Sequence, residues 1–199
     1  DDTDAHERTK IQYGTSFFYP ISSVGAHVSA VPNHQTGRSV SLKTRGIVAM
    51  AGSFGYEMNL GRLSDEEKQM MKEQICTYKE RQPLIHDGLY YRLTDPMQGD
   101  MAAWEWHDPK SGQVLVQGVV YRTQPNCLKR RVRLMGLDPE GQYCLQTSEK
   151  DVDQRLYTGM ALMQGGVLLE LDREDDAGFE LFFTRKESHG NQRKDVNEI

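Results

Sequence analysis

The sequence predicts an α/β region followed by an all-β region in a chain of 199 residues. Over the first 85 residues the local patterns run in the order helix, strand, helix, strand, helix. This order is typical of repeated β/α units around a parallel sheet. Beyond Pro83 the pattern changes to short alternating runs separated by turn residues, as in an antiparallel β-sandwich. Because two or three β/α units cannot close a barrel, we expect the α/β region to be one portion of a barrel.

Three helices and two strands are predicted in the α/β region. The clearest helix follows Ser64, whose side chain forms a capping box with Glu67, and Pro83 is expected to end it. The first helix has a partial apolar stripe and is expected to end before Pro20. The helices are expected at residues 5–19, 39–51 and 64–83, and the strands at residues 25–32 and 54–60.

Seven short runs predict the strands of the sandwich, at residues 89–93, 101–107, 113–121, 130–134, 143–146, 166–171 and 179–184. Strong turn signals occur at residues 108–112 and 138–141, because Pro presets φ and Gly accepts positive φ. We therefore divide the chain into a barrel portion, a sandwich and a polar tail, at residues 1–85, 86–188 and 189–199.

The composition excludes two classes of partner. A net charge of -5 and a pI near 5.7, without a dense Lys/Arg stripe, argue against nucleic acid. The longest apolar runs, such as residues 47–51, are far shorter than the roughly 20 residues of a membrane-spanning helix, so we expect no membrane span. Cys76, Cys127 and Cys144 are widely spaced and odd in number, which predicts reduced core thiols.

An acidic cluster opens the chain, immediately before the first predicted helix. Asp1, Asp2 and Asp4 lie within four residues. One interpretation is an N-cap cluster that the helix dipole stabilises. The other is a catalytic carboxylate at the carboxyl end of a barrel strand, where such barrels place their chemistry.

Candidate sugar-binding residues lie in the turn after the first predicted strand and within the second. Asn33 and His34 follow the first strand, and Glu57 lies in the second. In a barrel all three would reach the rim where substrate binds, although a hydrogen-bonded loop histidine and a buried or bridging glutamate are the more ordinary interpretations of His34 and Glu57. Trp104 and Trp106 share one face of a strand, which favours a core position over a sugar-stacking platform.

The remaining motifs predict no metal or cofactor. His86, His107 and His189 do not combine with cysteines or carboxylates at metal-ligand spacing. The glycine-containing stretch at residues 52–55 lacks the Lys-Ser/Thr pair that a phosphate-binding loop requires.

Three stretches of the first 85 residues carry a resemblance to a known family. They are DDTDAHERTKIQYGTSFFYP, GAHVSAVPNHQTGR and RGIVAMAGSFGYEMNLGRLSDEEK, in this order along the chain. They closely resemble consecutive segments of glycoside hydrolase family 36, the bacterial and fungal α-galactosidases, and the resemblance continues more weakly through LIHDGLYYRL and LYTGMALMQGGVLL. It implies the C-terminal part of such an enzyme, with the last β/α units of a (β/α)8 TIM barrel followed by a β-sandwich.

The resemblance also implies a reaction and a role for the acidic cluster. Such enzymes are retaining exo-α-galactosidases, which remove terminal galactose from oligosaccharides such as melibiose and raffinose by double displacement. The acid/base Asp of the family begins a motif similar to DDTD, which implies Asp1 in this role, with Asp2 and Asp4 as alternatives. The family's nucleophile lies in an upstream Lys-x-Asp segment that has no counterpart here. We therefore expect activity from the full-length enzyme and not from this chain alone.

Two alternatives stay open beside the galactosidase. One is a non-catalytic sandwich module that binds carbohydrate or mediates assembly. The other is a related α-N-acetylgalactosaminidase or galactosyltransferase, since most of the pocket that distinguishes them lies outside these segments. For the galactosidase we expect an oligosaccharide substrate, a homo-oligomeric full-length enzyme and a cytoplasmic location.

Overall fold

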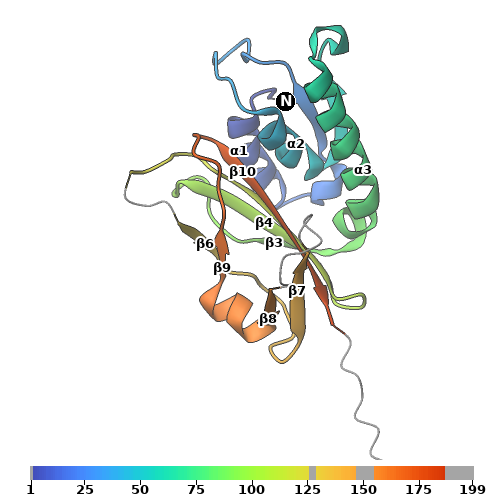
Figure 1. Ribbon diagram of the computed structural model, residues 1–199, viewed down its shortest axis with the longest axis vertical. Helices are drawn as coiled ribbons and strands as arrows, with labels where there is room; N and C mark the ends of the chain where they lie inside the picture. Colours follow the sequence, from blue (N-terminus) through green and yellow to red (C-terminus); the bar gives the residue numbers. More distant parts are fainter. Residues whose placement is uncertain (1, 126–128, 147–154, 187–199) are drawn as a thin grey trace, which may run out of the picture.

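The computed structural model describes residues 2–125, 129–146 and 155–186. Figure 1 shows the α/β region at one end of the molecule and the antiparallel strands below it. The α/β region contains α1 Ala5–Thr15, β1 Gly25–Ser29, α2 Leu42–Met50, β2 Ser53–Glu57 and α3 Asp65–Asp87. The β-rich region contains β3 Leu89–Arg92, β4 Met101–Asp108, β5 Gln113–Val120, β6 Arg130–Val132, β7 Gln142–Gln146, β8 Leu156–Thr158, β9 Val167–Leu169 and β10 Ala177–Arg185.

The α/β region has the parallel pairing that the sequence predicts. β1 and β2 run parallel, with Gly25 opposite Ser53 and Ser29 opposite Glu57. Ala26 and Val28 of β1 pack with residues of α2 and α3 in one apolar cluster, so the helices cover one face of this pair. The predicted capping box at the start of α3 is confirmed, since Ser64 and Glu67 bond each other's backbone amides. A parallel strand pair covered by helices is the arrangement of β/α units in a barrel.

The β-rich region is a six-stranded antiparallel sheet with a small second sheet against it. The strand order is β3-β4-β5-β10-β7-β8, and β6 pairs with β9 separately. All seven predicted strands are confirmed. Two elements, β8 and the π-helical turn Ala161–Gly165, were not predicted.

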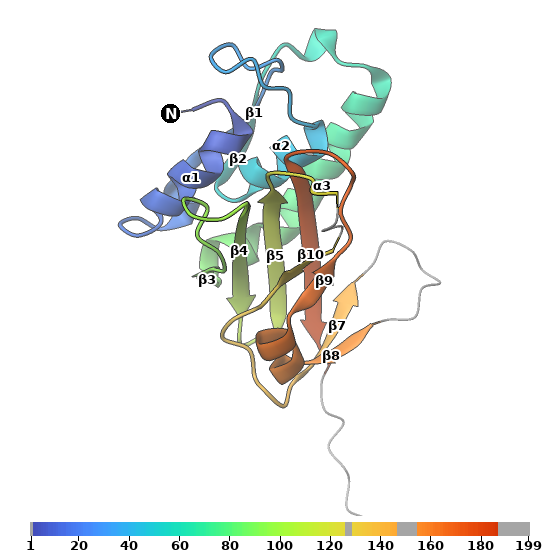
Figure 2. The ribbon, with the colours of Figure 1, turned by 90° about the vertical axis from the view of Figure 1, so that its left-hand side faces the viewer.

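Both faces of the six-stranded sheet are buried. In Figure 2 the strand β9 and the π-helical turn lie in front of the sheet, and α2 and α3 lie behind it. The helix-facing cluster includes Trp104, Trp106, Leu115 and Phe182 from the sheet with Ile47, Val48, Leu84 and Ile85 from the helices. The opposite cluster joins Val114, Val116 and Phe183 to Val132, Leu162 and Val167. Trp104 and Trp106 are therefore core residues, as favoured above, and cannot form a sugar-stacking platform.

Helix α2 joins the two regions because it is buried on nearly every side. Of its nine residues only Lys43 is exposed. On the side of the sheet, Thr44 donates a hydrogen bond to the carbonyl of Asp176 and accepts one from the amide of Gly178. A Cβ at Gly178 would lie 2.7 Å from the Thr44 hydroxyl and 2.9 Å from its Cα. Glycine is thus required where β10 meets α2, and the contact leaves no space between the regions.

Three predicted features of the helices are wrong. Helix α1 ends at Thr15 rather than near Tyr19, and its buried face is polar instead of apolar. Gln12 is buried there because its amide donates to the Val48 carbonyl, at 3.2 Å. Pro83 does not end α3, which continues to Asp87 because the next two residues, Leu84 and Ile85, are buried against the sheet.

The cysteines are only partly as expected. Cys144 of β7 is buried, whereas Cys76 lies exposed on α3, and Cys127 lies outside the described residues. Within the described part of the chain, none of the helices is long and apolar enough to cross a membrane.

Glu105 of β4 is a carboxyl buried inside the sheet. Its exposed fraction is 0%, and Oε2 accepts a hydrogen bond from the Met135 amide at 3.0 Å. Oε1 has no hydrogen-bond partner, and burial raises the pKa of Glu105 to about 8. His107 follows on the same face of the strand, and burial lowers its pKa. The sheet therefore holds a neutral acid at neutral pH.

We predict that Glu105→Gln makes the protein less sensitive to alkaline pH. Between pH 4.5 and about 8 the folded protein keeps a proton on Glu105 that the unfolded chain releases, so wild-type stability falls as pH rises through this window. The amide of Gln keeps the acceptor for Met135 and does not ionise. The stability of the Glu105→Gln variant relative to wild type should therefore increase from pH 5 to pH 8.5, by on the order of 4 kcal/mol.

Denaturant unfolding at several pH values measures this difference. The matched control is Gln117→Glu in the neighbouring strand, which adds a buried carboxyl and should increase the sensitivity to pH. An equal stability difference between Glu105→Gln and wild type at pH 5 and pH 8.5 would contradict the assignment.

Candidate functional site

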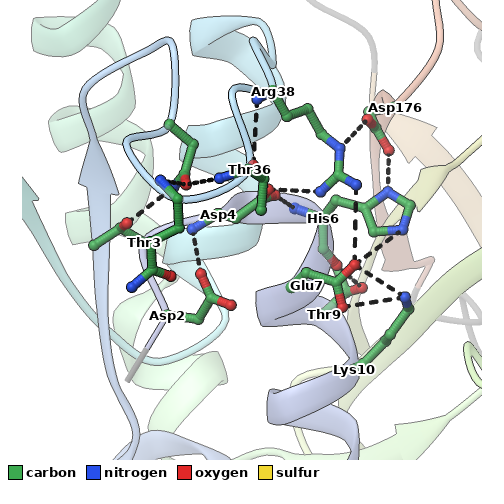
Figure 3. A network of polar contacts seen from close by, with 12 residues as sticks. Asp2, Thr3, Asp4, His6, Glu7, Thr9, Lys10, Thr36, Arg38 and Asp176 are labelled. Atoms are coloured by element: carbon green, nitrogen blue, oxygen red, sulfur yellow. Dashed lines mark hydrogen bonds and ion pairs between the residues drawn. The ribbon is translucent and has the colours of Figure 1, made fainter.

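The candidate site lies at the carboxyl ends of β1 and β2. Residues 2–4 precede α1, and their partners come from the loop that follows β1 (Figure 3). Glu57 is the last residue of β2, next in the sheet to Ser29 at the end of β1. Barrel enzymes place their catalytic groups at this edge of the sheet. The structure thus brings the sequence-predicted acidic cluster and the residues after both strands to one edge.

Asp4 is the structural centre of this edge. Its Oδ1 accepts a hydrogen bond from the His6 amide at 2.9 Å, which confirms the N-cap interpretation for this residue. Its Oδ2 accepts hydrogen bonds from the Thr36 hydroxyl at 2.5 Å and from Arg38 Nη1 at 2.6 Å. Burial opposes the charge of Asp4, but the bonds from Thr36 and Arg38 outweigh it and lower the pKa of Asp4. An ionised, fully bonded carboxylate suits an anchor better than a proton donor.

The loop after β1 folds around Asn33. The Asn33 side-chain oxygen accepts from the amides of Gln35 and Thr36, at 2.9 and 3.0 Å, and its amide group donates to the Thr3 hydroxyl at 2.9 Å. Asn33 is buried, so it shapes the loop that carries Thr36 to Asp4. His34, in contrast, is exposed at the surface of the same loop. Of the two predicted sugar-binding residues, His34 is the one open to a ligand.

Two buried arginines fix the ends of β1. Arg8 of α1 donates to the carbonyls of Gly25 and Asp2, and Arg45 of α2 donates to the Ser29 carbonyl at 2.6 Å. Burial lowers the pKa of Arg8, and the negative charges of Asp2 and Glu57 act in the opposite direction. Arginine stays protonated in such surroundings, so Arg8 places a positive charge beside two candidate carboxylates.

The other predicted carboxylates have different surroundings. Asp1 lies outside the described residues. Asp2 is half-buried, and its Oδ1 accepts from the Asp4 amide at 2.8 Å. Glu57 is exposed, with Oε2 3.9 Å from Nδ1 of His27 on the neighbouring strand. Among the described carboxylates of the predicted site, Asp2 and Glu57 therefore differ from Asp4, because their oxygens are not surrounded by hydrogen-bond donors.

Sequence reasoning missed the basic partners of the cluster and a carboxylate from the β-rich region. Arg38 lies 34 residues from Asp4, and Asp176 contacts both Arg38 and His6 from a turn that precedes β10. No local spacing indicates such pairings. The only available signal was the placement of Arg38 inside the GAHVSAVPNHQTGR stretch.

Known families match both regions of the chain. Residues 1–88 match the Melibiase family model, and residues 101–183 match the model of the Glycosyl hydrolase family 36 C-terminal domain. The bifunctional α-galactosidase/sucrose kinase AgaSK of Mediterraneibacter gnavus is 48% identical over 190 residues, which cover 96% of this chain and 20% of that protein. The α-galactosidase AgaA of Geobacillus stearothermophilus is 47% identical over 163 residues, covering 81% of this chain and 22% of the relative. The chain belongs to glycoside hydrolase family 36.

Solved structures of the family share the fold. The galactosidase domain of AgaSK superposes with a TM-score of 0.88 at 49% identity, over 94% of this chain and 25% of that chain. A variant of AgaA from Geobacillus stearothermophilus in complex with raffinose gives a TM-score of 0.86 at 42% identity, over 92% of this chain and 25% of that one. The chain spans a fifth to a quarter of the length of these relatives. It corresponds to the end of their barrel and the sandwich behind it.

We predict that Asp4→Asn destabilises the protein at neutral pH. The amide keeps an N-cap acceptor but removes the negative charge that Arg38 pairs with, which should cost about 1–3 kcal/mol because Asp4 is buried while Arg38 is partly exposed. Since the folded pKa of Asp4 is lowered, its contribution is present above the unfolded value of 3.8 and lost as pH falls through the folded value.

Melting temperatures at pH 7 and pH 3 measure this effect, and the gap between variant and wild type should shrink at the lower pH. Asp65→Asn is the control, because it removes an ion pair with Lys68 whose carboxylate is almost fully exposed. A gap that is the same at both pH values, or no larger than that of the control, would refute the anchoring role of Asp4.

Proposed function

We propose that this chain acts as part of a retaining exo-α-galactosidase, which removes terminal α-galactose from oligosaccharides of the melibiose and raffinose type. Membership of family 36 supports this proposal, as do relatives named α-galactosidases, one of them solved in complex with raffinose. The observation that carries it is the acidic segment at residues 2–4, held at the carboxyl edge of the strands by the bonds of Asp4 to Thr36 and Arg38.

The proposed chemistry divides the carboxylates into two roles. Retaining glycosidases use two carboxyl groups about 5–5.5 Å apart, one as nucleophile and one as acid and then base. Asp1 is our candidate for the acid/base, with Asp2 as the alternative, while Asp4 supplies the fixed anchor beside them. The nucleophile belongs to another part of the full-length enzyme, so this chain alone should not turn over substrate.

Substrate contacts are proposed for the loop after β1. His34 is exposed on this loop, with ring nitrogens suited to sugar hydroxyls, and Asn33 supports the loop from inside. Within this scheme the β-rich region is structural, because its two tryptophans are buried.

We also propose that the division between barrel and sandwich lies near residue 85, close to the end of α3 at Asp87. The separate family-model matches to residues 1–88 and 101–183 support it. The odd number of widely spaced cysteines suits a cytoplasmic location. A homo-oligomeric full-length enzyme is part of the same proposal.

The full-length enzyme should release nitrophenol from 4-nitrophenyl α-galactoside and galactose from raffinose. It should act much more slowly on the corresponding α-N-acetylgalactosaminide, and a reversed preference would favour the α-N-acetylgalactosaminidase alternative. Transfer of galactose to an acceptor sugar without net hydrolysis would favour the galactosyltransferase. No release from any of these substrates would exclude the glycosidase.

Asp1→Ala in the full-length enzyme should lower kcat/KM strongly on raffinose and much less on 4-nitrophenyl α-galactoside. Raffinose has a poor leaving group that must be protonated as it departs, whereas nitrophenolate leaves without a proton, and general acid catalysis contributes about 10²–10⁴-fold. Asp2→Ala is the matched variant one residue away. Should Asp2→Ala show the selective loss and Asp1→Ala not, the acid/base role moves to Asp2; equal losses on both substrates for both variants would remove it from this segment.

A further inference from the structure

Asp176 belongs to the β-rich region, but its side chain lies at the acidic edge of the barrel portion, which is formed by residues 2–4 and the carboxyl ends of β1 and β2. It lies in the turn between β9 and β10, and it is buried, with an exposed fraction of 8%. Its Oδ1 is 2.6 Å from Nδ1 of His6, and its Oδ2 is 3.8 Å from Nε of Arg38. Figure 3 shows both contacts, with Asp176 on the opposite side of Arg38 from Asp4.

The backbone of Asp176 is held in an unusual conformation. Its φ is 55°, the only positive value at a non-glycine residue in the described part of the chain. The conformation is fixed from two sides, because the Asp176 amide donates to the Tyr121 carbonyl at 3.2 Å and its carbonyl accepts from the Thr44 hydroxyl at 2.9 Å. Glycine would adopt this conformation without strain, so the presence of Asp points to a use for its side chain.

The side chain of Asp176 contacts two of the three residues that donate hydrogen bonds to the Asp4 carboxylate. His6 donates its amide to Oδ1 of Asp4, and Arg38 donates Nη1 to Oδ2 of the same carboxylate. The Asp4 amide in turn donates to Oδ1 of Asp2. A continuous series of hydrogen bonds and ion pairs therefore runs from the β-rich region to Asp2, the neighbour of Asp1 in the sequence.

The ring of His6 is fixed by its surroundings in the β-rich region. It packs against the Tyr121 ring at a tilt of 34°, with centroids 4.2 Å apart, and the Tyr121 hydroxyl lies 2.5 Å from that of Thr9 in α1. Asp176 sets the rotation of the ring through the bond to Nδ1. The start of α1 is thus located by residues that come more than a hundred positions later in the chain.

We propose that Asp176 is a positioning residue for the acid/base segment, so that the sandwich orients the proton donor of the barrel. This proposal rests on the proposed function. Without the Asp176 carboxylate, Nδ1 of His6 loses its partner, and Arg38 can turn further toward Glu7, which lies 3.9 Å from its Nη2. The segment at residues 2–4 would then lose its fixed orientation. A displacement of about 1 Å in a catalytic group can cost about 10²-fold in rate.

The test compares two variants of Asp176 with a matched control in the full-length enzyme. Asp176→Gly removes the side chain and accepts the positive φ, and Asp176→Asn keeps an acceptor for His6 without the charge for Arg38. The control is Asp172→Asn, which removes an exposed ion pair with Lys43, 2.6 Å long, at the same junction between the regions. Each enzyme is assayed for kcat/KM on raffinose and on 4-nitrophenyl α-galactoside.

We expect Asp176→Gly to lower kcat/KM on raffinose about 10–100-fold and on the nitrophenyl substrate less than 5-fold. Asp176→Asn should show a smaller selective loss, and Asp172→Asn should stay within 2-fold of wild type on both. If Asp176→Gly gives no folded enzyme, the ratio of the two activities in Asp176→Asn decides, and a wild-type ratio overturns the proposal.

Equal losses on both substrates would also overturn it, because a merely structural residue lowers the amount of active enzyme without changing the ratio. Titration of the active sites with a mechanism-based inactivator counts the active enzyme molecules, so that a smaller amount of active enzyme can be distinguished from a lower rate per active site. Inactivity of the wild-type enzyme on both substrates would instead contradict the proposed function itself.

Discussion

The burial of α2 is the constraint on which the rest of the structure depends. The helix has parallel strands and α3 on one side and the six-stranded sheet on the other, and only Lys43 reaches solvent. Each side of the helix is apolar, so either region alone would leave a hydrophobic helix face in water. The sheet in turn needs the helices, because they cover Trp104 and Trp106. The barrel portion and the sandwich therefore share one core.

Because the two regions share one core, most charged groups at the acidic edge can be paired with opposite charges or with hydrogen-bond donors. Burying the Asp4 carboxylate is unfavourable in itself, and three hydrogen bonds from His6, Thr36 and Arg38 reverse that balance. Glu105 shows the opposite case, because one bond from Met135 does not offset burial and the group stays neutral. Two buried acids thus differ in charge because of the number and kind of donors around them.

Local patterns in the sequence were sufficient for most elements of the fold. Alternating runs and turn residues predicted seven strands, all of which the structure contains, and the pair Ser64 and Glu67 predicted the start of α3. The failures have a tertiary origin. Pro83 is tolerated because Leu84 and Ile85 are buried beyond it, and α1 buries polar residues such as Gln12, which bond to other elements.

The same distinction applies to the candidate site. The acidic cluster and the turn at Asn33 were visible because each is local in the sequence, and Asp4 is indeed an N-cap. The partners that determine its chemistry, Arg38 and Asp176, are 34 and 172 residues away from Asp4. Side-chain pairing over such separations depends on the packing of α2 against β10, which no periodic pattern in the sequence describes.

The close approach of Gly178 to Thr44 has a consequence for chimeric enzymes. Exchanging the sandwich between two family members transfers Gly178 and Asp176 together, while Thr44 and His6 remain with the barrel. A donor sandwich with any side chain at the glycine position would displace β10 from α2 and carry the carboxylate away with it. Whether a barrel and a sandwich fit each other therefore depends on a few matched residues where β10 meets α2. We expect the barrels and sandwiches of this family to have diversified as pairs.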